Sequence, residues 1–389
     1  MTQYDVAVVG LGALGSAAAY YAAKKGARVI AFEQFELGHV RGASHDTSRI
    51  VRTSYELPDY VALAKSAYRD WADIEAEAKQ KLLTITGGVV FYPKSREPSA
   101  SEWVAGLKAN NVAYELLSNK EFNARWPQFD IKDDYDVIYT PDTGIAHAWK
   151  SVAAMQFLAR FHGAELMERT KVERVTPGGS QDSGVTIETS NGQFRASKVV
   201  LAADAWINEL LEPLGLNVPL GITQEQVTYF KPTDPAAFDH NRLPTWIWIG
   251  EQWYYGFECY GEPAIKCGHD NARNYMTPSE RTFVPSRKII DELSVAMQSM
   301  MPDPGRQEIR TVTCQYTMTP DRQFIITPLE HHKDIIVTLG AAHAFKFAPA
   351  IGRVAAELAI DGKTKEDIAN FGFPTPESLA NPMRSKIAG

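Results

Sequence analysis

The chain has 389 residues, of which 44% are hydrophobic and 22% charged, and its formal net charge is −7. This length predicts about two domains with a sizeable core, and the acidic balance argues against binding to nucleic acid or to an anionic membrane surface. No apolar run approaches the roughly 18 residues of a membrane span. Its three cysteines, Cys259, Cys267 and Cys314, form no CxxC motif and no disulfide framework, so we expect a reducing, cytoplasmic location.

The first 33 residues predict a βαβ unit that binds a dinucleotide. An apolar strand over 4–9 meets the sequence Gly-Leu-Gly-Ala-Leu-Gly, whose glycines are Gly10, Gly12 and Gly15. A helix of small residues follows, and a second strand ends at Glu33. The three glycines allow a tight turn, approach of the backbone to a pyrophosphate, and close packing of helix on strand. The helix N-terminus would bind the phosphates and Glu33 a ribose hydroxyl, but the motif alone leaves NAD and FAD open.

Residues 38–55 form a long polar stretch that contains Ser44, Arg49 and Arg52. A loop of this length inside a compact fold is usually functional. Arg49 and Arg52 stand three residues apart, so a helical turn here would present both side chains on one face. Two interpretations remain open for this stretch: a functional loop, or a solvated, positively charged turn.

Periodicity predicts the remaining elements. We expect helices over 60–79, 102–110 and 152–163, a turn and strand over 84–91, and an irregular stretch over 127–141. Residues 171–206 alternate like three antiparallel strands that lead into a buried strand, which is typical of FAD-binding rather than NAD-binding domains. The aromatic-rich stretch 224–269 predicts an antiparallel sheet over a site. A buried strand over 334–340, a small-residue turn and a helix over 350–360 complete the pattern.

Several motifs then fall in a characteristic order between about residues 4 and 362. They are GLGALG with Glu33, Gly42 to Arg52, the turn at Trp206, Tyr254-Tyr255-Gly256-Phe257, Lys266, Cys314-Gln315-Tyr316, Pro320-Asp321, and His343-Ala344-Phe345-Lys346-Phe347. Together they resemble the monomeric sarcosine oxidase family, whose relatives include N-methyltryptophan oxidase, pipecolate oxidase and the fructosyl amino acid oxidases.

The resemblance implies an α/β fold with two domains. A Rossmann-like FAD-binding domain would be discontinuous, built from residues 1–86, 144–220 and 314–389. A second, mainly antiparallel β domain for the substrate would consist of residues 87–143 and 221–313. The ligands should lie between the two domains, over the carboxyl ends of the parallel strands. The family also implies a monomer.

The activity that the resemblance implies is oxidation of the C–N bond of a secondary-amine amino acid. Hydride equivalents would pass to FAD, the imine would hydrolyse, and O2 would reoxidise the flavin to give hydrogen peroxide. In the family a ring methyl of the flavin is bonded to a cysteine, and the matching residue is Cys314. The substrate is left open between an N-methyl amino acid and a fructosyl amino acid.

The resemblance also assigns roles to individual residues. Lys266 would promote oxygen reduction, and Arg49 and His343 would lie beside the flavin ring. Arg52 and Lys346 would bind the substrate carboxylate, in a pocket lined by Tyr255 and Tyr316. The residues predicted to contact the cofactor are Gly10, Gly12, Gly15, Glu33, Ser44, Arg49, Val172, Cys314 and Lys346. No histidine spacing indicates a metal site.

The sequence departs from the family at three points. Ala342 and Ala344 flank His343 where glycines are usual, and Asp204 replaces a usual glycine. The spacing from Lys266 to the next histidine is one residue shorter than in sarcosine oxidases, so neither His269 nor Asp270 is assigned a catalytic role.

Two alternatives to an oxidase are a flavin dehydrogenase with another electron acceptor and a non-catalytic dinucleotide-binding protein. Lys266 favours oxygen as acceptor. A non-catalytic protein would have no reason to keep Cys314, Lys266, Arg52 and Lys346 together.

Overall fold

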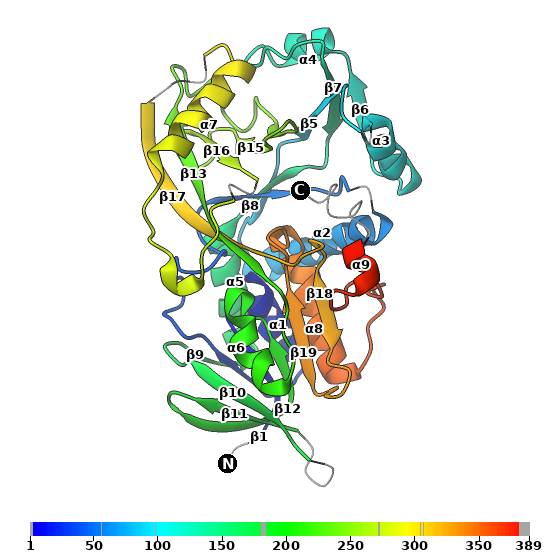
Figure 1. The fold of residues 1–389 in the computed structure, drawn as a ribbon, viewed down its shortest axis with the longest axis vertical. Helices are drawn as coiled ribbons and strands as arrows, with labels where there is room; N and C mark the ends of the chain where they lie inside the picture. Colours follow the sequence, from blue (N-terminus) through cyan, green and yellow to red (C-terminus); the bar gives the residue numbers. More distant parts are fainter. Residues whose placement is uncertain are drawn as a thin grey trace.

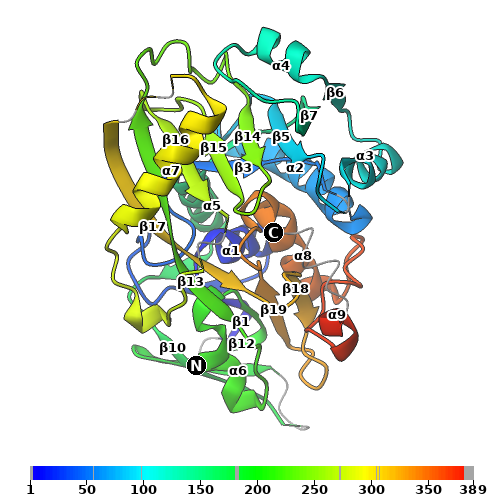
Figure 2. The same ribbon diagram turned by 45° about the horizontal axis from the view of Figure 1, so that its top comes forward.

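The computed structural model describes residues 3–55, 57–97, 99–179, 184–270, 273–303, 305 and 307–380. Within these ranges the chain forms two large sheets toward opposite ends of the long axis and a small third sheet (Figure 1). Helices pack mainly against the first sheet, and α7 (Arg287–Met300) lies on the second (Figure 2). The predicted α/β class, with a second, mainly antiparallel sheet, is confirmed.

The first sheet carries the N-terminal βαβ unit. Its strand order is β10-β11-β12-β1-β2-β9, with β19 beside β12 and β18 beside β19. The strands are β1 (Gln3–Val9), β2 (Val29–Phe32), β9 (Glu165–Met167), β10 (Val172–Pro177), β11 (Val185–Thr189), β12 (Gly192–Leu201), β18 (Ile325–Pro328) and β19 (Ile335–Leu339).

The predicted run of three antiparallel strands before a buried strand is confirmed. β10, β11 and the first half of β12 form an antiparallel ladder, whereas the last residues of β12 pair in parallel with β19. β1 runs parallel to β12, with Val9 opposite Leu201. The turns that follow these two strands therefore meet at one edge of the sheet, which is where ligands bind in parallel α/β sheets.

Small residues let three helices pack closely behind this edge. α1 (Ala13–Lys24) lies between α5 (Ala148–Phe161) and α8 (Ala348–Asp361), and α2 (Pro58–Ala78) packs on α8. A Cβ atom added at Gly352 of α8 would lie 2.3 Å from the Cβ of Ala17 on α1. α8 ends where Gly362 adopts a φ of +69°, as its sequence predicts.

The second sheet has the strand order β17-β13-β16-β15-β14-β5-β7-β6, and all neighbours are antiparallel except β14 and β5. Its strands are β5 (Gly88–Pro93), β6 (Glu115–Leu117), β7 (Tyr135–Thr140), β13 (Gly221–Lys231), β14 (Thr245–Trp248), β15 (Tyr254–Phe257), β16 (Ile265–His269) and β17 (Gln307–Met318). The predicted irregular stretch over 127–141 is therefore wrong, because β7 lies within it. Its buried Val137 and Ile138 pair with β5, but the prolines at either end of the stretch concealed the strand.

A third sheet contains β3 (Ser48–Val51), β8 (Gly144–His147) and β4 (Leu83–Ile85). β3 lies in the polar stretch 38–55, where a helical turn would place Arg49 and Arg52 on one face. Arg49 pairs across the ladder with Ala146, and Arg52 follows the end of the strand. The two arginines therefore do not share the face of a helical turn, because the β8 ladder holds this segment extended.

The remaining helices are short or peripheral. They are α3 (Ala100–Ala109), α4 (Asn119–Arg125), α6 (Ile207–Leu211) and α9 (Pro376–Ala380), with 3₁₀ turns η1 (Asp204–Trp206), η2 (Glu212–Leu214), η3 (Pro278–Glu280) and η4 (Phe345–Phe347). Among the described residues, no helix is both long enough and apolar enough to cross a membrane.

Glu258 follows β15 and is a buried carboxyl group whose partners are hydroxyls. Its Oε2 accepts a hydrogen bond of 3.2 Å from Thr245 Oγ1, and burial raises its pKa to about 8. A carboxyl group that binds its proton more tightly in the folded state stabilises the protein at low pH, and this contribution is lost as pH rises toward 8.

We expect Glu258→Gln to remove this pH dependence. The free energy of unfolding of the wild type, relative to the variant, should fall by about 3 kcal/mol between pH 5.5 and pH 8. Urea unfolding at the two pH values measures the difference. If the free energy of unfolding changed equally with pH in the wild type and the variant, Glu258 would have an ordinary pKa in the folded protein.

Candidate active site

A cavity with a volume of about 460 Å³ lies between the first and second sheets. From the first sheet it is lined by residues at or just beyond the carboxyl ends of β1, β2, β12 and β19, such as Gly10, Glu33, Ala202 and Gly340. From the second sheet it is lined by side chains of β13, β15 and β17. The cavity thus occupies the edge at which a dinucleotide site is expected.

The glycine-rich turn provides a narrow backbone cradle at this edge. Gly10 adopts a φ of +93°, and a Cβ atom there would lie 2.4 Å from the carbonyl oxygen of Ala202. A Cβ atom at Gly15 would lie 1.8 Å from the carbonyl oxygen of Gly10. Gly12 is the N-cap of α1, so the helix N-terminus faces the same turn. The three glycines therefore allow the close approach that a pyrophosphate needs.

Glu33 is buried beside this turn and is held as a carboxylate. Its Oε2 accepts a hydrogen bond of 3.0 Å from the Leu11 N–H, and its Oε1 accepts one of 3.1 Å from the Phe35 N–H. Burial alone would raise its pKa, but hydrogen bonds from His39 and Leu11 outweigh burial and lower the pKa. The residue can thus accept hydrogen bonds from ribose hydroxyls, so the turn and Glu33 fit a bound dinucleotide.

Two further residues predicted to contact the cofactor line the same part of the cavity. Ser44 Oγ accepts a hydrogen bond of 3.0 Å from the Ala13 N–H in the first turn of α1. Val172 is the first residue of β10.

Gly15→Ala should disrupt the cradle, because the added methyl group would overlap the carbonyl oxygen of Gly10. We expect a loss of stability of about 3 kcal/mol or more, measured by thermal unfolding. Gly12→Ala is the matched control for stability, since its Cβ would lie 3.1 Å from the Ser44 Oγ atom, a contact that can relax. An equal loss of stability in the two variants would contradict the cradle geometry.

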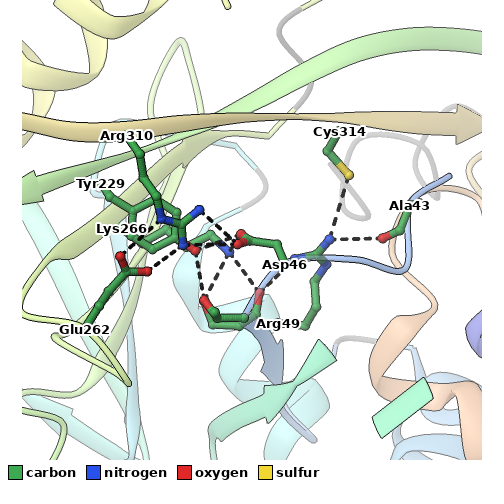
Figure 3. Close-up of polar contacts among 10 residues, drawn as sticks. Ala43, Asp46, Arg49, Tyr229, Glu262, Lys266, Arg310 and Cys314 are labelled. Carbon is green, nitrogen blue, oxygen red and sulfur yellow. Dashed lines mark hydrogen bonds and ion pairs between the residues drawn. The ribbon is translucent and has the colours of Figure 1, made fainter. Parts of the chain in front are cut away.

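The guanidinium of Arg49 lies beside the sulfur atom of Cys314 (Figure 3). Its guanidinium donates hydrogen bonds to the backbone oxygens of Ser48 and Ala43, at 2.9 and 3.0 Å, and Nη2 lies 3.8 Å from the Cys314 Sγ atom. Cys314 lies on β17 and lines the cavity, whereas burial raises the pKa of Cys259 to about 12 and also raises that of Cys267. Among the three thiols, Cys314 is thus the one with a cation beside its sulfur atom and access to the cavity.

Lys266 is 2% exposed and is anchored by Asp46 (Figure 3). Its Nζ lies 2.7 Å from Asp46 Oδ2 and also donates to the backbone oxygen of Ser48 at 3.0 Å. Burial lowers the pKa of Lys266 to about 8, although Asp46 opposes the shift. Lys266 is not among the side chains that line the cavity in the described structure, and it lies 5.0 Å from the ring of Phe257, which does.

Asp46 is also held from its other side. Arg310 Nη2 lies 3.3 Å from Asp46 Oδ1 and 2.5 Å from Glu262 Oε1, and Tyr229 donates a hydrogen bond to Asp46. The charges of Lys266 and Arg49, together with the hydrogen bonds from Lys266 and Tyr229, lower the pKa of Asp46 against the effect of burial, so the carboxylate stays ionised. Sequence reasoning missed Asp46 and Arg310, because nothing in their local sequence marks partners so distant along the chain.

The two cations predicted to bind the substrate carboxylate lie against one aromatic ring. The Arg52 guanidinium is 4.4 Å and the Lys346 Nζ is 5.7 Å from the centroid of Tyr55. Arg52 also donates to the backbone oxygen of Ser54 at 2.6 Å, and Lys346 to that of His343 at 2.9 Å. Burial and the charge of Arg52 lower the pKa of Lys346, while Tyr55 opposes the shift. The structure therefore brings Arg52 and Lys346 together, although they are far apart in sequence.

The predicted pocket tyrosines and His343 line the same cavity. The side chains of Tyr255 on β15 and Tyr316 on β17 share a hydrogen bond. His343 Nε2 lies 3.0 Å from the backbone oxygen of Arg322, so this nitrogen carries the proton. Burial and nearby cations hold the pKa of His343 well below its usual value. The ring is therefore neutral, with an unprotonated Nδ1.

A comparison with known proteins places this geometry in a family. The family described as "FAD dependent oxidoreductase" (DAO) matches residues 5–358. The chain belongs to this family. A monomeric sarcosine oxidase of Bacillus sp. (strain B-0618) is 32% identical over 380 residues, which cover 96% of this chain and 97% of that one. The N-methyl-L-tryptophan oxidase of Salmonella dublin is 28% identical and covers 95% of this chain and 98% of its own.

The solved structure of NikD, an unusual amino acid oxidase essential for nikkomycin biosynthesis, has a TM-score of 0.84 and 28% identity. It covers 97% of this chain and 98% of its own. The predicted resemblance to the sarcosine oxidases and the predicted class, an FAD-dependent amine oxidase, are confirmed by these relatives.

Within this FAD-dependent family, the shorter spacing after Lys266 has a clear structural result. His269 is the last residue of β16, and its ring packs 4.9 Å from that of Tyr254, with Nε2 3.8 Å from Glu292 on α7. His269 does not line the described cavity, whereas the next residue, Asp270, does. Successive residues of a strand face opposite sides of the sheet. A spacing that is shorter by one residue therefore exchanges which of the two side chains, His269 or Asp270, faces the cavity.

Two of the other departures occupy backbone positions that favour glycine. Asp204 adopts a φ of +47° and Ala342 one of +73°, as does the neighbouring Ala341 at +45°, whereas Ala344 adopts an ordinary φ of −84°. A residue with a Cβ atom in this region costs roughly 1–2 kcal/mol. The chain therefore carries strain in two turns that line the cavity, and the Asp204 carboxyl accepts a hydrogen bond of 3.3 Å from Gln315 Nε2.

Proposed function

We propose that this protein oxidises the C–N bond of an N-substituted amino acid, with FAD as the electron acceptor and O2 as the final oxidant, giving hydrogen peroxide. The observation that carries the proposal is that Arg52 and Lys346 flank Tyr55 in the same cavity as the dinucleotide cradle. A planar guanidinium and an ammonium group beside each other suit a carboxylate. The named substrates of the relatives, sarcosine and N-methyl-L-tryptophan, support the same class.

FAD, when bound, supplies a two-electron acceptor, and the chain's own residues bind and orient the reactants. The glycine turn, Ser44, Glu33 and Val172 would hold the dinucleotide. Arg52 and Lys346 would fix the substrate carboxylate, while Tyr255 and Tyr316 would bound the pocket. Because a neutral amine is the reactive form, the low pKa of His343 keeps one more positive charge away from the amine.

We further propose that Cys314 holds the flavin covalently. The bond would join a ring methyl carbon to Sγ with loss of one hydrogen from each, and O2 would take up the two electrons and both protons as hydrogen peroxide. The position of Cys314 supports this assignment, because the residue lines the cavity and its Sγ lies 3.8 Å from Arg49 Nη2. Lys266 would serve oxygen reduction, and Arg49 would also stabilise negative charge on the ring.

The N-substituent is proposed to be either methyl or a larger polar group such as fructosyl. Asp270 and Arg322, both in the cavity wall, favour a polar group because they offer an acceptor and a donor. The chain is also proposed to act as a monomer, in line with the names of its sarcosine oxidase relatives.

The test is to follow flavin absorbance anaerobically while adding sarcosine, N-methyltryptophan, pipecolate, fructosyl-glycine and fructosyl-valine in turn. Rapid bleaching by one of them identifies the substrate class. A yellow protein that none of them bleaches would leave the cofactor assignment intact and overturn the proposed substrate class. Hydrogen peroxide formed in air would then separate an oxidase from a dehydrogenase.

A further inference from the structure

Arg322 is a cation of the cavity wall to which the roles above assign no particular ligand. It lies in the turn between β17 and β18, where its φ is +56° and its N–H donates to the backbone oxygen of Thr319 at 3.1 Å. Only 9% of the residue is exposed, and it lines the cavity. Its backbone oxygen is the partner of His343 Nε2. The turn therefore fixes Arg322 next to the proposed catalytic pocket.

The guanidinium of Arg322 has no hydrogen bond among the described residues. Its Nε is buried without a partner, and its ion pair with Asp270 is long, at 3.7 Å between Nη2 and Oδ1. By contrast, the guanidinium of Arg49 and the Nζ of Lys346 donate hydrogen bonds of 3.0 Å or less. A buried charged group without hydrogen bonds is costly, unless a ligand completes it.

The charges around His343 point to the sign of that ligand. The pKa of this ring is lowered by the charges of three cations, Lys346, Arg322 and Arg52. Asp270 is the carboxylate that pairs with Arg322, and its charge raises the pKa of Lys346. Two further cavity carboxylates are already bonded elsewhere: Asp46 to Lys266 and Glu225 to the hydroxyl of Thr223. Asp270 and one substrate carboxylate on Arg52 and Lys346 would leave one of the three positive charges at this end of the pocket uncompensated.

We propose that Arg322 binds a second acidic group of the substrate, so that the protein acts on an N-substituted amino acid with two carboxylates. This inference rests on the proposed function, because Arg52 and Lys346 must first bind the α-carboxylate. The second carboxylate is carried either by the N-substituent or by the side chain of the amino acid. The guanidinium fork of Arg322 binds it through N–H groups that donate no hydrogen bond among the described residues.

The experiment measures binding of unreactive thioethers, in which sulfur replaces the amine nitrogen. Thiodiacetate and (methylthio)succinate carry two carboxylates, and (isobutylthio)acetate is the matched probe with one. Each is titrated into oxidised wild-type holoenzyme, and the change in flavin absorbance gives its dissociation constant. At least one dianion should bind about tenfold or more tightly than the monoanion, the scale of one charge-assisted hydrogen bond.

Two variants distinguish the site that binds the second carboxylate from the site that binds the α-carboxylate. Arg322→Leu should abolish the preference for the dianion and leave the monoanion within about threefold of wild type, whereas Arg52→Gln should weaken all three probes by about tenfold or more. Arg322→Gln serves the same purpose if the leucine variant does not fold. The wild-type comparison alone also tests the proposal, without any variant.

The outcomes distinguish a failure of the Arg322 inference from a failure of the proposed carboxylate site. If the wild type binds the monoanion as tightly as both dianions, or if Arg322→Leu weakens all probes equally, Arg322 binds no second acid and this inference is wrong. If none of the probes binds, or if Arg52→Gln changes nothing, the proposed carboxylate site itself is wrong. Rapid flavin bleaching by fructosyl-valine, together with no dianion preference, would assign Arg322 to a neutral polyol instead.

Discussion

Cys314→Ser is expected to abolish covalent attachment of the flavin. Cys314 is the thiol that lines the cavity beside Arg49, and serine cannot form the thioether. After acid precipitation, we expect all the flavin of the variant in the supernatant and nearly all that of the wild type in the pellet. The glycine cradle should still bind FAD reversibly in the variant, because it does not depend on the sulfur atom.

Cys259→Ser is the matched control. Cys259 is 7% exposed, and burial raises its pKa to about 12, so its thiol stays protonated at neutral pH. This variant should keep its flavin in the pellet. Release of flavin from both variants, or from neither, would be incompatible with attachment at Cys314.

Lys266→Met should slow reaction of the reduced protein with oxygen by about 100-fold, the scale of removing one preorganised charge from an active site. The reason is that negative charge develops on oxygen as it accepts electrons, and Lys266 is a buried cation held rigidly by Asp46. Photochemical reduction followed by rapid mixing with oxygenated buffer measures the rate without requiring knowledge of the substrate.

The control for this change is Lys288→Met, because the side chain of Lys288 is 85% exposed on α7. Its rate of reoxidation should equal that of the wild type. Lys266→Arg keeps a positive charge and should lose less than the methionine variant. Reoxidation of Lys266→Met within about threefold of wild type would remove Lys266 from the oxygen reaction and favour a dehydrogenase.

The parts of the molecule that could be predicted from sequence are those specified by local spacing. Gly10, Gly12 and Gly15 fall within six residues and lie between two apolar strands, so their turn, helix and acidic partner Glu33 follow from short-range geometry. The end of α8 at Gly362 is local in the same way. Arg52 and Lys346, by contrast, could be paired only through resemblance to a family.

The parts that could not be predicted depend on contacts between distant segments. Asp46 anchors Lys266 across 220 positions of sequence, and Arg322 meets Asp270 only because a turn of one segment faces the end of a strand in another. The periodicity of a sequence carries no information about such contacts between distant residues. The choice between His269 and Asp270 was equally hidden, since it required knowing which side of β16 faces the cavity.

The position of Cys314 has a consequence for how the protein retains its cofactor. The residue lies on β17 of the second sheet, whereas the glycine turn and Glu33 belong to the first. A thioether at Cys314 would tie one end of the dinucleotide to the opposite sheet. Whenever the cradle releases the other end, the dinucleotide would stay at an effective concentration on the order of millimolar and rebind. Dilution, which empties a reversible site, would then leave this one filled.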